Sequence, residues 1–400
     1  MTRTSDNAIE QLNAILAGPL AAAEPVPGAI AQVTTAHETV YAGAAGKRSV
    51  GEEEPITADS VLTIFSATKA VATVAILQLA ESGDLDLDVP AKRYAPELDD
   101  IKVLAGFAED GSPVLRDPKG DITTRMLLLH TAGFGYPNFN ADYQRLLRSG
   151  VIASPGDATF AALKAPLLFD PGEGWEYGLG LDWAGVIAER IAGVRLEQLL
   201  KERVLLPLGM ASTAFVISDD MRARFAPVHT RLPDGGVMAL DYVLPQEPEI
   251  YMAGQALYST VPDYIKFIRM WVNDGRSADG AQILRPETVE VASRSGLGAL
   301  KVHPLPGVDR FMNLDIDFFP GTRTSWAFAG MVNDERLPTG RPAGSLSWVG
   351  LANSYYWIDR RNGIGGFWAS NTLPLGDPTS LDAYLSFETT VYQKLLPALK

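Results

Sequence analysis

The sequence predicts an α+β protein: a central antiparallel sheet that is flanked by helices and carries a helical insertion. Two observations predict this class. Strand-like runs gather at both ends of the chain, whereas helices and loops fill its middle. Turn signals such as Arg360-Arg361-Asn362-Gly363 separate the late strand-like runs, as in an antiparallel meander. We therefore expect a sheet domain built from residues 1–85 and 255–400, and a mainly helical insertion domain over residues 86–254.

The N-terminal half of the sheet domain is predicted from periodicity and turn residues. Residues 7–16 place their apolar side chains on one face of a helix. Residues 28–35 and 39–45 are expected to form two strands of a hairpin. Residues 60–65 lead in extended form into a buried helix that begins at Ser66 and stops before the Gly- and Pro-containing segment 83–90.

The remaining elements follow the same two patterns. Helical spacing predicts helices over residues 123–130, 182–191, 196–204, 263–272 and 381–399. Aromatic-rich apolar runs predict late strands over residues 324–332, 344–349, 354–359 and 363–370.

Composition excludes several classes of function. The net charge of −14 argues against nucleic acid and anionic membrane surfaces as partners. The absence of cysteine excludes disulfides, a thiolate nucleophile and a Cys-ligated metal. We find no signal-peptide core at the N-terminus and no apolar run of about 18 residues, so the cytoplasm is the expected compartment. A homo-oligomer remains possible.

Ser66 and Lys69 form the first candidate for chemistry. Their spacing places both side chains on one helical face, one turn apart. A lysine in the first turn of an apolar helix has little water around it and opposes the helix dipole, and both effects favour the neutral amine that a base needs. The alternative interpretation is a helix-start serine followed by a solvated lysine.

Other catalytic motifs can be eliminated. The sequence lacks Gly-x-Ser-x-Gly, a phosphate-binding Gly-x-x-x-x-Gly-Lys loop and any zinc-binding pair among its four histidines. The cluster Gly363-Ile364-Gly365-Gly366 lacks the third glycine of a dinucleotide loop and is expected to bend or pack a strand. Ser66 with Lys69 is the best-supported nucleophile that remains.

Two further stretches are candidate site elements. Tyr177 lies in the glycine-rich run 171–180, where its phenol would act as a base if an ammonium stabilised the phenolate. The run 344–353 contains Trp348 and is predicted as a strand that ends at Gly350, where a ligand can approach closely. The alternatives are an ordinary core tyrosine and a core strand with a packing tryptophan.

Together these stretches resemble the three motifs of serine β-lactamase-like proteins. The motifs are Ser66-Ala67-Thr68-Lys69, Tyr177-Gly178-Leu179 and Trp348-Val349-Gly350. Further signatures lie between them in the family's order, namely the runs 127–134, 207–210 and 257–264. The branch that the chain resembles most is that of the family VIII carboxylesterases, which are related to class C β-lactamases and D-alanyl-D-alanine carboxypeptidases; acyltransferases of the lovastatin pathway are similar too.

The resemblance implies an acyl-enzyme mechanism without a metal or cofactor. Ser66 would be the nucleophile, and Lys69 and Tyr177 would form the coupled pair that removes its proton, with the formal base left open. The backbone N–H groups of Ser66 and Leu351, the residue after Gly350, would hold the oxyanion.

Two departures from the family pattern concern the substrate. Leu179 stands where class C β-lactamases have asparagine, and Trp348 stands where they have lysine, so a carboxylate on the substrate would lose its cationic partner. We therefore expect short- to medium-chain neutral esters as substrates. The expected pocket walls are aromatic residues of nearby loops: Phe134, Tyr136, Trp175 and Tyr258.

Three functions are consistent with this sequence. Ester hydrolysis is the first. The second is acyl transfer, or hydrolysis of amides, β-lactams or D-amino-acid peptides, by a member of the same fold. The third is a non-catalytic binding homologue, against which the intact Ser66, Lys69 and Tyr177 argue.

Overall fold

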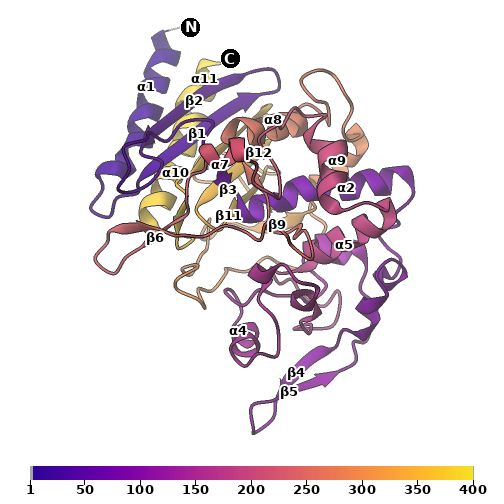
Figure 1. Ribbon diagram of the computed structural model, residues 1–400. Coiled ribbons are helices and arrows are strands. Elements are labelled where there is room, and N and C mark those ends of the chain that lie inside the picture. Colours follow the sequence, from indigo (N-terminus) through magenta and orange to yellow (C-terminus); the bar gives the residue numbers. More distant parts are fainter. Residues whose placement is uncertain (1–2, 400) are drawn as a thin grey trace.

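A computed structural model describes residues 3–399 and confirms the α+β class. Its centre is a seven-stranded antiparallel sheet of order β2-β1-β13-β12-β11-β10-β9 (Figure 1). The sheet joins strands from the two ends of the chain: β1 (Gly28–Thr35), β2 (Thr39–Gly46), β9 (Thr324–Ala327), β10 (Gly330–Asn333), β11 (Leu346–Gly350), β12 (Ser354–Asp359) and β13 (Ile364–Ala369).

Helices cover both faces of the sheet, which explains why β11, β12 and β13 are buried along their whole length. On one face, α8 (Val261–Val272) packs so closely on β13 that a Cβ at Gly365 would lie 2.5 Å from Ile268. On the other face, Trp357 of β12 packs against Phe387 of α10 (Pro378–Thr390). Glycine in β13 therefore serves packing, as the sequence predicted.

Further long helices pack against other helices, and the rest are short. The N-terminal helix α1 (Arg3–Ala17) lies beside α10 and the C-terminal turns (Figure 1). The helix α2 (Thr68–Ser82) packs against α5 (Gly180–Ala192). The remaining helices are short: α3 (Thr124–Leu128), α4 (Ala141–Arg148), α6 (Leu196–Leu200) with a π-helical turn (Lys201–Leu205), α7 (Asp219–Ala223), α9 (Pro286–Ala292), and a π-helical turn (Val391–Leu395) followed by α11 (Leu396–Ala398).

Three small sheets lie outside the central one. The hairpin of β4 (Val103–Phe107) and β5 (Pro113–Arg116) protrudes from the end of the molecule that carries α4 (Figure 1). The other two sheets tie distant segments together: β3 (Leu62–Thr63) with β8 (Tyr258–Ser259), and β6 (His229–Arg231) between β7 (Val237–Ala239) and β14 (Thr372–Leu373).

Two predictions of elements were wrong in detail. Residues 324–332 do not form one strand; the chain reverses between β9 and β10, where Gly330 has φ of +146°. The buried helix begins at Thr68 rather than Ser66, because residues 65–67 form a 3₁₀ turn. The domain boundaries at 85/86 and 254/255 stay a prediction. Within residues 3–399, no helix is long and apolar enough to cross a membrane.

Candidate active site

Ser66 lies in the 3₁₀ turn Phe65–Ala67 directly before α2. The turn is preceded by β3, and Phe65 adopts a left-handed conformation with φ of +42°, which is uncommon for a bulky side chain. This backbone presents Ser66 to a pocket while Ala67 turns into the core. Lys69 still reaches the serine, since its Nζ lies 3.3 Å from Ser66 Oγ.

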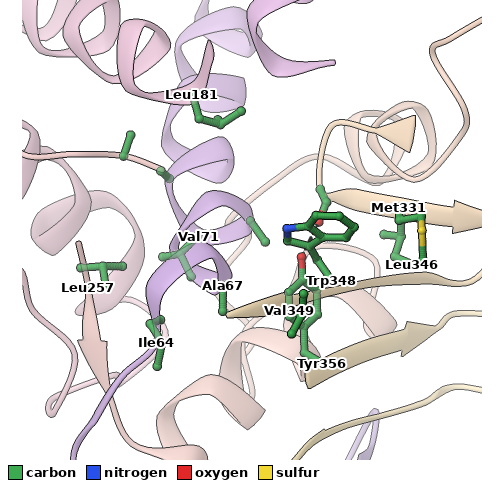
Figure 2. Close-up of a cluster of buried hydrophobic side chains, with 14 of the residues drawn as sticks. Ile64, Ala67, Val71, Leu181, Leu257, Met331, Leu346, Trp348, Val349 and Tyr356 are labelled. Carbon is green, nitrogen blue, oxygen red and sulfur yellow. Dashed lines mark hydrogen bonds between the residues drawn. The ribbon is translucent and has the colours of Figure 1, made fainter. Parts of the chain in front are cut away.

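Gly350 fixes the end of β11 against the chain that leads to Ser66. A Cβ at Gly350 would lie 2.2 Å from the carbonyl oxygen of Ile64. Figure 2 shows Ile64, Ala67 and Val71 in the same buried cluster as Trp348 and Val349 of β11. The sequence predicted the close approach of a ligand at Gly350, whereas the approach that the structure shows there is made by the protein's own backbone.

Lys69 is buried, with 5% of its surface exposed. Its Nζ donates to the carbonyl oxygen of Gly254 at 2.7 Å and to Tyr136 Oη at 3.2 Å, and it lies 4.7 Å from the centre of the Tyr177 ring. Burial lowers the pKa of Lys69 to about 7, while the negative charge of Asp182 opposes this shift. A large fraction of the amine is therefore neutral near pH 7.

Tyr177 lies across from Lys69 and is also buried. Its Oη accepts a hydrogen bond of 2.8 Å from Trp348 Nε1. Burial raises the pKa of Tyr177 above its ordinary value, and hydrogen bonds with Ser66 and Trp348 only partly offset this. The next residue, Gly178, has no room for a side chain, because a Cβ there would lie 2.2 Å from the carbonyl oxygen of Phe134. The phenol is thus a neutral group held between Ser66 and Trp348.

Asp182 is a site residue that sequence reasoning missed. It lies buried in the first turn of α5, where its Oδ1 accepts from the backbone N–H of Gly254 at 2.7 Å and its Oδ2 from Tyr136 Oη at 3.3 Å. Burial raises the pKa of Asp182, and the nearby Lys69 opposes this shift. In the sequence, an acidic residue in a first helical turn is ordinary, so no signal marked it.

A pocket of about 370 Å³ opens at Ser66 and is lined mainly by apolar side chains. Its described lining residues include one carboxyl side chain, Asp309, and no lysine or arginine. Of the predicted site residues, five line it: Ser66, Tyr136, Tyr177, Trp348 and Leu351.

Three predicted aromatic walls lie elsewhere. Phe134, which was expected to line the pocket, is instead buried in the core, and its carbonyl oxygen lies against Gly178. Trp175 packs on His303 with ring centres 5.1 Å apart and borders a neighbouring cavity. The hydroxyl of Tyr258 accepts from the backbone N–H of Leu244 at 2.8 Å in the core. Residues from distant loops take their place: Tyr242, Phe311 and Met312.

Two backbone N–H groups at the pocket are candidate donors to an oxyanion. Ser66 and Leu351 both line the pocket, and neither backbone N–H has an acceptor within the described part of the chain. Both N–H groups are therefore free to donate, and their role in holding the oxyanion stays a prediction. Across residues 3–399, no group of three or more His, Asp or Glu side chains is arranged to hold a metal ion.

The fold is that of serine β-lactamase-like proteins, and comparison with known proteins agrees. The Beta-lactamase family model matches residues 6–390, so the chain belongs to this family. An acyltransferase of Penicillium decumbens, calJ, is 31% identical over 87% of this chain and 84% of its own length. A lovastatin esterase of Penicillium rubens is 31% identical over 92% of this chain and 95% of its own.

Solved structures agree with these relatives. The unliganded simvastatin synthase LovD of Aspergillus terreus superposes with a TM-score of 0.83 at 28% identity, covering 96% of this chain and 98% of that one. Because the relatives include acyltransferases and an esterase, they support an acyl-transfer enzyme, a serine hydrolase or acyltransferase, for this chain.

Proposed function

We propose that the protein is a serine esterase that cleaves small-molecule carboxylic esters with neutral acyl groups through an acyl-enzyme on Ser66. One observation carries the proposal. Ser66 Oγ lies at the wall of an apolar pocket, 3.3 Å from the Nζ of a buried lysine. A hydroxyl beside an unprotonated amine is the arrangement that activates a serine nucleophile.

The chemistry proceeds in two halves. Ser66 Oγ bonds to the ester carbonyl carbon while its proton passes to the Lys69–Tyr177 pair. The carbonyl oxygen, now negative, lies between the N–H groups of Ser66 and Leu351, and each such donor typically lowers the barrier by about 3 kcal/mol. The alcohol leaves with a proton from the pair, and water then releases the acid by the reverse sequence.

The pocket wall supports neutral substrates. No cationic side chain is among the described lining residues, and Asp309 would repel an anion. Trp348 offers an apolar ring, and its N–H is already donated to Tyr177. A β-lactam or a C-terminal peptide bears a carboxylate near the scissile bond, and a buried carboxylate without a partner is costly. Short- to medium-chain uncharged esters fit this wall.

Acyl transfer to an alcohol is the second candidate. Relatives named as acyltransferases share about 30% identity with nearly the whole chain. An apolar pocket of about 370 Å³ also has room for an organic acceptor in place of water. Transfer and hydrolysis share the acyl-enzyme and differ only in which hydroxyl attacks it.

One assay tests both candidates. Purified protein is given p-nitrophenyl esters from acetate to longer chains, and nitrocefin in parallel, each with and without an added alcohol. We expect turnover of acetate to butyrate and slow or absent nitrocefin turnover. New ester formed at the expense of free acid would favour transferase activity. If the protein hydrolysed nitrocefin as fast as its best ester substrate, the esterase assignment would be contradicted. If it turned over no ester at all, a binding homologue would be favoured.

A further inference from the structure

The hydrogen bonds around Lys69 can be counted. Its Nζ has three oxygen neighbours: Gly254 O at 2.7 Å, Tyr136 Oη at 3.2 Å and Ser66 Oγ at 3.3 Å. A neutral amine has two N–H bonds and one lone pair, so the three neighbours cannot all be acceptors. The carbonyl oxygen of Gly254 only accepts, and it therefore takes the first N–H.

The carboxylate of Asp182 determines the direction of the second bond. Both of its oxygens accept, Oδ1 from the Gly254 N–H at 2.7 Å and Oδ2 from the Tyr136 hydroxyl at 3.3 Å. The single proton of Tyr136 is thus committed to Asp182, and its Oη presents a lone pair to Lys69. The second N–H of Lys69 goes to Tyr136, which leaves the amine lone pair facing Ser66.

Gly254 is where these groups meet. Its N–H binds Asp182 and its carbonyl binds Lys69. A Cβ at this position would lie 2.8 Å from Asp182 Oδ2 and 2.8 Å from Tyr136 Oη. Only glycine therefore leaves room for the contact between the carboxylate and the phenol.

We infer that Asp182 and Tyr136, held together over Gly254, are positioning residues that aim the lone pair of Lys69 at the Ser66 hydroxyl. The inference rests on the proposed function and assigns the base that the sequence left open. The Ser66 proton passes to Lys69 Nζ as Oγ bonds to the carbonyl carbon. When the C–O bond to the alcohol breaks, Tyr177 gives its phenol proton to the alcohol oxygen and regains one from the Lys69 ammonium.

The surrounding groups are consistent with these roles. Tyr177 accepts from Trp348 and keeps its own proton for donation. The remaining titratable neighbour is His130, whose pKa is lowered by burial and by Lys69. Its Nδ1 accepts from the Gly178 N–H at 3.2 Å, so the ring is neutral. Asp182 is then the acidic group that acts on the charge of Lys69.

The first test removes the phenol oxygen that orients Lys69. Tyr136→Phe keeps the ring at the pocket wall, so KM should change little. Loss of the oriented amine should lower kcat for p-nitrophenyl butyrate by roughly ten- to a hundredfold. The matched control is Tyr143→Phe, because Tyr143 is also buried and its hydroxyl donates to the Pro166 carbonyl, away from the site. Equal kcat in the two variants would overturn the inference.

The second test uses a readout that a purely structural role would not move. Asp182→Asn removes the charge that raises the pKa of Lys69, so the acidic limb of the kcat/KM profile should shift to lower pH while kcat falls. Asp263→Asn is the control, because Asp263 is also buried and also accepts a backbone N–H, from Ser212, but lies outside the pocket. An unshifted limb in a folded Asp182→Asn protein would overturn the inference.

A third variant covers the case in which Asp182→Asn does not fold. Gly254→Ala removes no polar group, but its Cβ would lie 2.8 Å from Asp182 Oδ2 and Tyr136 Oη and 2.9 Å from Asp182 Oδ1, so these groups must move apart. We expect kcat to fall although the charge of the site is unchanged. Wild-type kcat in Gly254→Ala would also count against the inference. The proposed function has a separate test: if Ser66→Ala kept the ester turnover of wild type, the proposed function itself would be wrong. The three variants above would then no longer be needed.

Discussion

Trp348 Nε1 donates a hydrogen bond of 2.8 Å to Tyr177 Oη, and the two rings lie with centres 4.8 Å apart. The third motif of the chain thus acts directly on the tyrosine of the second. The sequence identified Trp348 as the residue that stands where class C β-lactamases have lysine. In the structure that N–H is occupied, so Trp348 orients the phenol as well as shaping the pocket.

Trp348→Phe is expected to lower kcat about fivefold with little change in KM. The substitution keeps an aromatic wall and removes one hydrogen bond, typically worth about 1 kcal/mol. Steady-state kinetics on p-nitrophenyl butyrate measure the effect. Trp368→Phe is the control, because Trp368 is buried in the same sheet and its Nε1 has no partner among the described residues. A similar loss in both variants would show that ring packing, not the N–H, matters.

Ser66→Ala is expected to reduce ester turnover more than a hundredfold and to leave the fold intact. Removal of a covalent nucleophile usually costs far more than removal of a binding group. Ser154→Ala is the control, since Ser154 lines the same pocket. Mass spectrometry after treatment with a fluorophosphonate should find Ser66 labelled in wild type. Label on another serine would relocate the site.

The pH profile should report Lys69. Burial lowers its pKa to about 7, and a base works only when unprotonated. Nζ is therefore neutral above pH 7 and carries a proton below it, so kcat/KM for an uncharged ester should fall about tenfold for each pH unit below 7. If the acidic limb of the kcat/KM profile had its midpoint below pH 5, the base would instead be a carboxylate.

Gly350→Ala is expected to destabilise the protein by about 1–3 kcal/mol and to reduce activity. The new methyl would lie 2.2 Å from the Ile64 carbonyl oxygen, and the backbone there leads into Ser66. Urea unfolding with activity assays on the same samples measures both effects. Gly120→Ala, which meets no atom within 4 Å, should change neither. If Gly350→Ala were as stable as wild type, β11 could move to make room for the methyl group without loss of stability.

The parts of the fold with strong periodicity were predictable. The hairpin of β1 and β2, the buried α2 and the late antiparallel strands follow directly from apolar spacing and turn residues. The short elements were not, because β4, β5, β6 and β7 are three to five residues long and carry little pattern. Likewise a reversal inside residues 324–332 depends on one glycine in an apolar run.

The candidate site divides in the same way. Ser66, Lys69 and Tyr177 stand in local motifs, and the structure brings them together. Asp182 and Gly254 carry no motif, because their role comes from contacts between segments 72 residues apart. The pocket walls Tyr242 and Phe311 were missed for this reason too, whereas Phe134 and Tyr258 were misplaced because sequence alone does not tell an inward aromatic from a pocket-facing one.

The left-handed backbone at Phe65 has a consequence for how this enzyme can change. A non-glycine residue in that region costs roughly 1–3 kcal/mol, and here the cost falls beside the nucleophile. The aromatic ring also lines the pocket and stacks on Tyr242 with an interplanar angle of 14°. At position 65, thermal stability therefore favours glycine, whereas the pocket needs the aromatic ring. A more heat-stable descendant would have to gain its stability at other positions or lose this part of the pocket wall.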